Sequence, residues 1–349
     1  MSELSNIRKI LVTGGCGFIG SNFVRFLIET EPEIQVVNFD LLTYAGNLAN
    51  NADVEGHPRY TFVRGDIANP EDVAGVFGPH KFDVVINFAA ETHVDRSIED
   101  SAPFVRTNVM GTQCLLDAAR QAGVGRYVQI STDEVYGSLG PDGMFREDTP
   151  LNPTNPYSAS KAGADLLVLS HAKTHGLPAV ITRCSNNYGP KQFPEKFIPL
   201  MLANAMEDKA IPVYGEGLNR REWIYVDDHS RGVWEAARRG ENGEVYNIGG
   251  GSEMTNIDLV RLVLKQLGKP ESLIRFVKDR PAHDLRYAID CSKMEKAWGW
   301  QAETDFPSGI GQTIAWYQSN PDWIRDVRDA TYRTYYDRHY TNRDQAVSS

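Results

Sequence analysis

The stretch Thr13-Gly14-Gly15-Cys16-Gly17-Phe18-Ile19-Gly20 decides how this chain folds. It follows a short apolar segment, residues 9–12, and precedes a segment with helical periodicity, residues 21–30. Gly14, Gly17 and Gly20 permit a tight turn and let a phosphate group approach the amino terminus of that helix, where unpaired N–H groups and the helix dipole favour an anion. Strand, glycine turn and helix therefore come in the order that a dinucleotide-binding unit requires.

The residue that ends the next apolar segment indicates which dinucleotide fits. Residues 35–39 are expected to form a second strand, which ends in Asp40, about twenty residues past the last glycine. A carboxylate there accepts hydrogen bonds from the adenosine ribose and would repel a 2′-phosphate, so the sequence predicts NAD and not NADP. The alternative is a glycine turn that only packs a helix on a sheet.

Strands and helices alternate through the first half of the chain. Further apolar segments are residues 60–64, 83–88, 127–130 and 179–183. Helix-compatible stretches such as 103–122 separate them, which predicts an α/β protein with a doubly wound parallel (Rossmann) sheet. Asp66 and Ile67 would then hold the adenine, and the small Ala89 and Ala90 would let the dinucleotide cross the sheet.

The composition of the chain changes after Asn187. Proline and glycine punctuate short elements as far as Arg221, which favours a smaller, loop-rich mixed α/β domain that binds the substrate. Residues 245–249 look like another buried strand, so both domains are predicted to be discontinuous. We expect a Rossmann domain of residues 1–190 with 224–252, a substrate-binding domain of residues 191–223 with 253–340, and a polar tail of residues 341–349.

Overall composition excludes several classes of function. The chain has 349 residues, which favours two lobes over a single core. Its 36 Lys and Arg against 46 Asp and Glu give a formal net charge of −10, which argues against a nucleic-acid partner. No apolar run reaches the length of about eighteen residues that a membrane span needs, and the start of the chain is polar. Neither export nor a membrane partner is expected, and the cytoplasm is the default location.

The cysteines and histidines show no metal-ligand spacing. Cys16, Cys114, Cys184 and Cys291 are far apart and form no Cys-x-x-Cys pattern. Reduced packing residues are therefore expected instead of a zinc site or a disulfide frame, and no metal is predicted.

Two further stretches carry the chemistry: Ser131-Thr132-Asp133-Glu134-Val135-Tyr136-Gly137 and Tyr157-Ser158-Ala159-Ser160-Lys161. A helix would place Tyr157 and Lys161 on one face, where the ammonium can lower the phenol pKa from its usual value of about 10. Asp133 and Glu134 follow an apolar strand and would lie at its carboxyl end, where open α/β sheets bind ligands. A redox base beside a pair of carboxylic acids indicates oxidation coupled to elimination. The alternatives are a chance Tyr/Lys pair and a solvated helix cap.

The glycine turn together with Tyr157 and Lys161 resembles the extended short-chain dehydrogenase/reductases, and finer motifs resemble their dTDP-glucose 4,6-dehydratases. These motifs are residues 43–48, 89–97, 131–137, 185–190, 193–196 and 279–284. The likeness runs from Ile10 to about Trp323. Sugar-nucleotide epimerases of the same superfamily usually lack the Asp-Glu pair.

The resemblance implies NAD-dependent dehydration of dTDP-glucose to dTDP-4-keto-6-deoxy-glucose. Tyr157, assisted by Lys161 and the Thr132 hydroxyl, would deprotonate the hydroxyl on carbon 4 while a hydride passes to NAD. Glu134 would remove the proton from carbon 5, and Asp133 would protonate the hydroxyl that leaves carbon 6, so the pair must hold opposite protonation states. Return of the hydride to carbon 6 restores NAD.

Two sets of contacts are implied as well. The NAD set is Gly14, Gly17, Phe18, Ile19, Gly20, Asp40, Leu41, Leu42, Thr43, Asp66, Ile67, Phe88, Ala89, Ala90, Glu91, Thr107, Tyr157, Lys161 and Asn187. The nucleotide-sugar set is Thr92, Thr132, Asn186, Lys196, Phe197, Pro212, Val213, Tyr214, Arg221, Asn256, Asp279, Arg280, Pro281, Ala282 and His283.

The family's usual assembly is a homodimer formed through the helices near residues 103–122 and 157–175, and the resemblance implies the same here. Three alternatives stay open at this point. They are a 4,6-dehydratase for a UDP-, CDP- or GDP-hexose, a 4-epimerase, and a noncatalytic NAD-binding scaffold.

Overall fold

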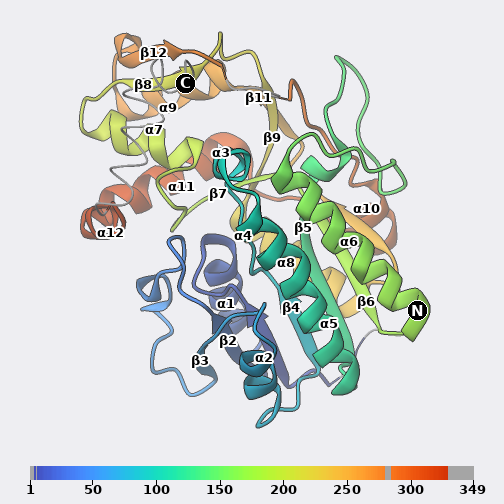
Figure 1. Cartoon of the computed structure of the whole chain (residues 1–349). Coiled ribbons are helices and arrows are strands. Elements are labelled where there is room, and N and C mark those ends of the chain that lie inside the picture. The colour runs from blue at the N-terminus through green and yellow to red at the C-terminus, as the bar shows by residue number, and fades with distance from the viewer. Residues whose placement is uncertain (1–3, 5, 280–283, 329–349) are drawn as a thin grey trace.

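A seven-stranded parallel sheet forms the centre of the computed structural model, which describes residues 4, 6–279 and 284–328 (Figure 1). The strand order is β10-β6-β5-β4-β1-β2-β3, and every neighbouring pair is parallel. The strands are β1 (Lys9–Thr13), β2 (Gln35–Asp40), β3 (Tyr60–Arg64), β4 (Val84–Asn87), β5 (Arg126–Thr132), β6 (Ala179–Cys184) and β10 (Val245–Ile248). The predicted doubly wound α/β fold is confirmed.

Alternate side chains of each strand enter two separate cores. In β1, Ile10 and Val12 pack on one face of the sheet and Leu11 packs on the other, all with no exposed surface. The first face is covered by α1 (Phe18–Thr30), α8 (Val226–Arg239) and α10 (Ser292–Trp298). The second is covered by α2 (Pro70–Phe77), α5 (Thr112–Gln121) and α6 (Pro156–His175). Because both faces are buried, the strands read as continuous apolar runs.

Local signals fix the ends of α6, the helix that carries Tyr157. Asn155 caps its start by accepting a hydrogen bond from the backbone N–H of Ser158, and Pro156 occupies the first position. Gly176 ends the helix in the left-handed conformation, with φ of 66°. These two ends hold Tyr157 in the first turn of the helix, next to the carboxyl ends of the strands.

The expected helix over residues 103–122 is interrupted. It consists of α4 (Ala102–Phe104), a π-helical turn η2 (Val105–Gly111) and α5. At Gly111 a side chain would not fit, because its Cβ would lie 2.6 Å from the Cδ1 atom of Ile67. The wider π-helical turn also brings Asn108 into contact with the segment that follows β4. Such turns often occur at functional sites.

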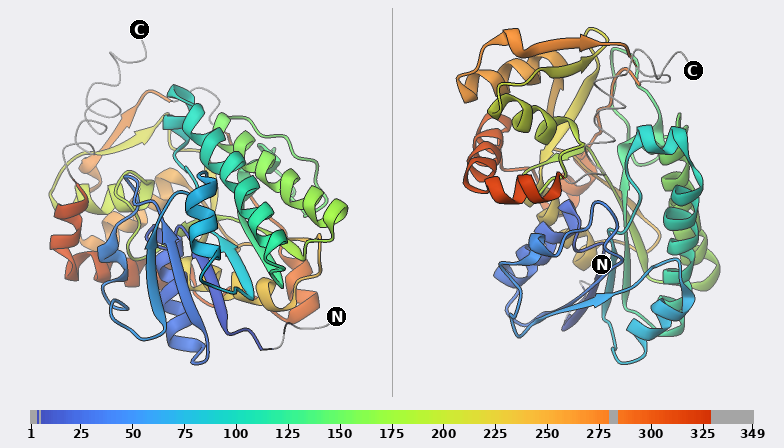
Figure 2. Two further views of the ribbon diagram at one scale, coloured as in Figure 1. Left: turned by 60° about the horizontal axis from the view of Figure 1, so that its bottom comes forward. Right: turned by 60° about the vertical axis from the view of Figure 1, so that its left-hand side comes forward.

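A smaller lobe lies beyond the carboxyl ends of the strands (Figure 2). Its strands are β7 (Asn186–Tyr188), β8 (Ile211–Tyr214), β9 (Arg220–Tyr225), β11 (Ser252–Thr255) and β12 (Ile274–Val277), and its helices are α7 (Phe197–Met206), α9 (Asn256–Leu267), α11 (Phe306–Ser319) and α12 (Pro321–Val327). They surround one apolar core that includes Leu202, Val213 and Tyr317. Short elements complete the described chain: α3 (Val94–Glu99), η1 (Leu48–Asn51), η3 (Asp133–Tyr136) and η4 (Glu271–Leu273).

The strands form three separate sheets, but this arrangement does not test where the predicted domain boundaries lie. As predicted, the chain returns to the large sheet at β10. In contrast, β7 pairs with β9 in a separate three-stranded sheet that also contains β11. The predicted division into two domains stays a prediction, and residues 329–349, including the tail, lie outside the described residues. Over the part of the chain that is described, no helix is long and apolar enough to cross a membrane.

Candidate active site

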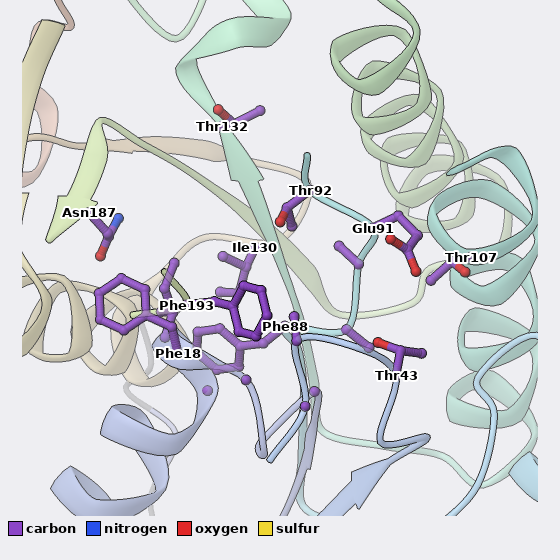
Figure 3. A pocket seen from close by; sticks show the side chains of 18 of the residues that line it. Phe18, Thr43, Phe88, Glu91, Thr92, Thr107, Ile130, Thr132, Asn187 and Phe193 are labelled. Carbon is purple, nitrogen blue, oxygen red and sulfur yellow. The ribbon is translucent and has the colours of Figure 1, made fainter. Parts of the chain in front are cut away.

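A cavity of about 290 Å³ lies along the carboxyl ends of the central strands. In Figure 3, Thr43, Glu91 and Thr107 lie on one side of this cavity and Phe18, Phe193 and Asn187 on the other. All five predicted catalytic residues line it, and so does every predicted NAD contact except Leu42. The structure therefore places the predicted catalytic residues and nearly all of the predicted NAD contacts around one cavity.

The glycine turn leaves room for a phosphate at the start of α1. Gly14 has a φ of 68°, and a Cβ there would lie 2.5 Å from the backbone nitrogen of Ala89. Gly17 precedes the helix, no side chain caps this end, and the first turn contains no acidic residue. The first N–H groups of α1 can therefore bind an anion, as the pyrophosphate of NAD requires.

Asp40 lies where an adenosine ribose would be held. Its carboxylate accepts hydrogen bonds from the backbone N–H groups of Cys16, at 2.9 Å, and Leu42, at 2.7 Å. Burial raises the pKa of Asp40, and these two hydrogen bonds oppose the rise. Each carboxylate oxygen has a second lone pair for a ribose hydroxyl. The structure thus fits NAD, although Leu42 contributes its backbone to Asp40 and not a side chain to the cavity.

The end of β5 supplies the acidic pair. Thr132 is the last residue of the strand, and its hydroxyl oxygen accepts a hydrogen bond from the Glu134 backbone N–H at 3.3 Å. The turn η3 that begins there is closed by Gly137, whose φ is 90° and whose Cβ would lie 2.5 Å from the Asn152 carbonyl oxygen. The sequence Thr-Asp-Glu-Val-Tyr-Gly therefore forms a rigid turn that presents both carboxyl groups to the cavity.

The surroundings of Asp133 favour its neutral form. It is only 2% exposed, the Thr132 hydroxyl donates to Oδ1 at 3.2 Å, and Oδ2 has no hydrogen-bond partner among the described residues. Burial raises the pKa of Asp133 well above its usual value, and the charges of Glu134 and Glu222 raise it further. Glu134 is partly exposed. Burial thus favours the protonated form of one carboxyl group beside another that meets solvent, which is how an acid and a base can coexist.

Tyr157 and Lys161 share the cavity, but the expected lowering of the phenol pKa is wrong for this structure. Burial raises the pKa of Tyr157 well above its usual value, and the negative charge of Glu134 raises it further, while a hydrogen bond with Thr132 lowers it. The Lys161 ammonium donates to the carbonyl oxygen of Ile130 at 2.6 Å, and burial lowers its pKa. For Tyr157, desolvation outweighs the hydrogen bond that favours the phenolate.

A second cavity of about 180 Å³ adjoins the first on the side of the smaller lobe. Thr92, Asn186 and Lys196 line both cavities. The other predicted nucleotide-sugar contacts that line it are Phe197, Pro212, Tyr214, Arg221 and Asn256. Val213 does not line it, because its side chain is buried in the core of the smaller lobe.

The remaining predicted contacts lie near or beyond the described part of this wall. The Asp279 carboxylate lies close to Gly215, where an added Cβ would be 3.0 Å from its Oδ2 atom. Arg280, Pro281, Ala282 and His283 lie outside the described residues.

Residues that the sequence did not single out complete the site. Asn108 accepts a hydrogen bond from the Glu91 N–H at 2.9 Å and donates to the Glu91 carbonyl and to the Ser160 hydroxyl of α6. Tyr287 lines the second cavity and lies against Arg221, whose guanidinium carbon is 4.4 Å from the ring centroid. No local sequence pattern distinguishes either residue, because each contacts segments that are distant from it in the sequence. Across the described ranges, no His, Cys, Asp and Glu side chains group as a metal site would.

Comparisons with known proteins agree with this geometry. The family described as GDP-mannose 4,6 dehydratase matches residues 11–313. A dTDP-glucose 4,6-dehydratase from Actinoplanes is 51% identical over 320 residues, which cover 90% of this chain and 99% of that protein. The dTDP-glucose 4,6-dehydratase of Escherichia coli is 46% identical, over 93% of this chain and 97% of that protein. The chain belongs to the dTDP-glucose 4,6-dehydratase family.

Solved members of the dehydratase family share the whole fold. A dTDP-glucose 4,6-dehydratase from Streptomyces venezuelae, with NAD and TYD bound, is 47% identical with a TM-score of 0.89, covering 91% of this chain and 99% of that one. A UDP-glucose 4-epimerase from Thermotoga maritima has a TM-score of 0.84 but only 27% identity, over 90% of this chain and 99% of that one. The fold is thus common to both activities, whereas sequence identity favours the dehydratases.

Replacement of Asp133 by Asn is expected to stabilise the protein near neutral pH. The folded state holds the Asp133 proton, whereas an unfolded aspartate loses it above a pH of about 3.9. The free energy of unfolding therefore falls as the pH rises from about 4 towards the raised folded pKa, and Asn removes this loss. Differential scanning calorimetry should show a higher Tm for Asp133→Asn at pH 7 than for the native protein, and a smaller difference towards pH 4.

The exposed Asp142 provides the control, because Asp142→Asn should leave Tm almost unchanged at every pH. A lower Tm for Asp133→Asn at pH 7 would show that the carboxyl group is ionised in the folded protein.

Proposed function

We propose that this chain is an NAD-dependent dTDP-glucose 4,6-dehydratase, which forms dTDP-4-keto-6-deoxy-glucose and water. The observation that carries the proposal is the buried Asp133 next to the partly exposed Glu134 in the cavity that also contains Tyr157 and Lys161. Oxidation at carbon 4 alone needs no such acidic pair. Elimination of water needs both an acid and a base, so the pair favours dehydration over epimerisation.

The first part of the reaction makes a ketone at carbon 4. Bound NAD would supply a hydride acceptor for the oxidation at carbon 4 and, once reduced, the hydride donor for carbon 6. Tyr157 takes the proton of the carbon 4 hydroxyl, and its hydrogen bond with Thr132 favours the phenolate. Burial opposes this ionisation, so Tyr157 has to be activated inside the assembled site. The ketone then acidifies the hydrogen on carbon 5.

The acidic pair performs the elimination without a change of its total charge. Glu134 takes the proton from carbon 5 while Asp133 gives its proton to the hydroxyl that leaves carbon 6. The pair holds one proton before and after the step, which suits two carboxyl groups that share a largely buried site. The unpartnered Oδ2 of Asp133 is the oxygen that can carry the donated proton.

The second cavity fits the nucleotide part of the substrate. Arg221 is 6% exposed and is held by the carbonyl oxygens of Arg220, at 2.8 Å, and Asp284, at 3.0 Å. Lys196 lies between the two cavities and donates to the Thr92 carbonyl oxygen at 2.8 Å. In a protein with a net charge of −10, these two cations provide local attraction for a diphosphate. Tyr214 and Phe197 supply apolar and aromatic walls for a base.

The nucleotide specificity gives the direct test of the proposal. Purified protein incubated with dTDP-, UDP-, CDP- and GDP-glucose is expected to form the 4-keto product fastest with dTDP-glucose, as followed by the alkaline absorbance of that product. A pocket that fits the thymine methyl group should favour dTDP- over UDP-glucose by about 10-fold or more in kcat/KM. A preference for the GDP-sugar, or no product with any of the four, would contradict the proposed substrate.

Two variants separate oxidation from elimination. Asp133→Asn should lower kcat by about 10²-fold, because the leaving hydroxyl loses its acid, while oxidation at carbon 4 continues. Reduced cofactor should therefore accumulate on the protein and be visible by its near-ultraviolet absorbance. Tyr157→Phe should prevent that absorbance from appearing. Full turnover by Asp133→Asn would remove Asp133 from the mechanism.

We also propose a homodimer formed through α6 and the adjoining η2. Val105 and Met110 of η2 and Leu166 of α6 are large apolar side chains that are 49%, 55% and 58% exposed, which supports a covered face. Leu166→Lys is expected to shift sedimentation from dimer to monomer, and a native protein that sediments as a monomer would refute the proposal.

A cytoplasmic location is supported by the four free cysteines.

The predicted domain division is retained as part of the proposal. Residues 1–190 with 224–252 would bind NAD, and residues 191–223 with 253–340 would bind the nucleotide sugar. The separation of the large sheet from the two smaller sheets supports a division into two domains, although β7 and the end of β9 belong to a smaller sheet and fall within the proposed NAD domain.

A further inference from the structure

A compact junction of three side chains lies beside the wall that the two cavities share. Tyr44 comes from the loop after β2, Arg96 from α3, and Glu195 from the loop before α7. Arg96 donates to the Oε2 atom of Glu195 from both Nε, at 3.2 Å, and Nη2, at 3.0 Å. Its guanidinium carbon also lies 4.1 Å from the centroid of the Tyr44 ring. Three segments that are far apart in sequence thus meet at one ion pair.

Tyr44 closes the third side of this junction. Its hydroxyl is hydrogen-bonded to Glu195, and its ring meets Phe193 edge to face with centroids 5.8 Å apart. Burial raises the pKa of Tyr44 well above its usual value, and the charge of Glu195 raises it further, so the hydroxyl keeps its proton and donates. The Glu195 side chain is only 1% exposed, so its buried charge depends on the hydrogen bonds from both Arg96 and Tyr44.

Each arm of the junction is directly bonded in sequence to residues that line the cavities. Thr43 precedes Tyr44 and lines the cofactor cavity, whereas Lys196 follows Glu195 and lines both cavities. Glu195 itself lines both. A ligand in either cavity therefore lies next to one arm of the junction, and charge-assisted contacts join the arms.

We infer that the Tyr44–Arg96–Glu195 junction couples the two ligand sites, so that NAD and a nucleoside diphosphate each raise the affinity of the protein for the other. The ligand that binds first orders side chains that the second ligand also needs, which lowers the entropic cost of the second binding step. This inference rests on the proposed function, because it takes the two cavities as the NAD and nucleotide-sugar sites. Tyr44 and Glu195 act as positioning residues in it.

Equilibrium dialysis of the holoenzyme tests the coupling. NAD occupancy is measured against free NAD, with and without saturating thymidine diphosphate, which lacks the hexose and so cannot react. In the native protein the nucleotide is expected to lower the dissociation constant of NAD by about 10-fold, and NAD should lower that of the nucleotide by the same factor. In Tyr44→Phe and in Glu195→Gln the factor should fall to about 2-fold or less.

Tyr246→Phe is the matched control. Tyr246 lies in β10, at the edge of the large sheet. Its hydroxyl accepts a hydrogen bond from the Glu241 backbone N–H at 2.9 Å. This variant should keep the native coupling factor.

Three results would overturn the inference: no coupling in the native protein, native coupling in both junction variants, or an equal loss in Tyr246→Phe. Binding of the nucleotide without coupling would refute the inference alone. Failure of the nucleotide to bind at all would refute the proposed function together with it.

Discussion

Removal of the Asp133 carboxyl group from water is the constraint on which the rest of the site depends. Asp133 is 2% exposed, and burial together with the charges of Glu134 and Glu222 raises its pKa, against the opposing charge of Arg221 and the hydrogen bond from Thr132. The parallel sheet creates this environment, because the end of β5 is covered by the smaller lobe on one side and by α6 on the other. Glu134, one residue later on the same turn, remains partly exposed.

This difference between neighbouring carboxyl groups also explains the order of events in the proposed reaction. A neutral Asp133 adds no negative charge near Tyr157 while the phenol loses its proton. The proton that Asp133 retains is then used when the hydroxyl leaves carbon 6. The same turn would therefore serve oxidation first and elimination second.

Most of the fold and of the catalytic set could be predicted from the sequence because the signals are local. The glycine turn predicted that α1 would follow β1. Apolar runs predicted the six strands β1 to β6 of the large sheet, with their ends correct to within two residues. The motif around Thr132 and the Tyr157/Lys161 pair indicated residues that the structure places in one cavity. Each of these signals lies within a single segment of the chain.

Features that arise from packing could not be read in this way. The π-helical turn at residues 105–111 is an example, because periodicity alone suggests a continuous helix there. Val213 is implied as a nucleotide contact together with Pro212 and Tyr214, yet the alternation of side chains along β8 directs it into the core. The raised pKa of Tyr157 follows from burial, which spacing on a helix does not report.

The isotope content of the product tests the central claim, that Asp133 and Glu134 act as separate acid and base around an intermediate ketone. When dTDP-glucose is converted in heavy water, nuclear magnetic resonance of the product should show deuterium at carbon 5, because that position is refilled from solvent. The hydrogen that arrives at carbon 6 should come from carbon 4 and not from the solvent. Product that carries no deuterium at carbon 5, or that takes its carbon 6 hydrogen from heavy water, would contradict the account.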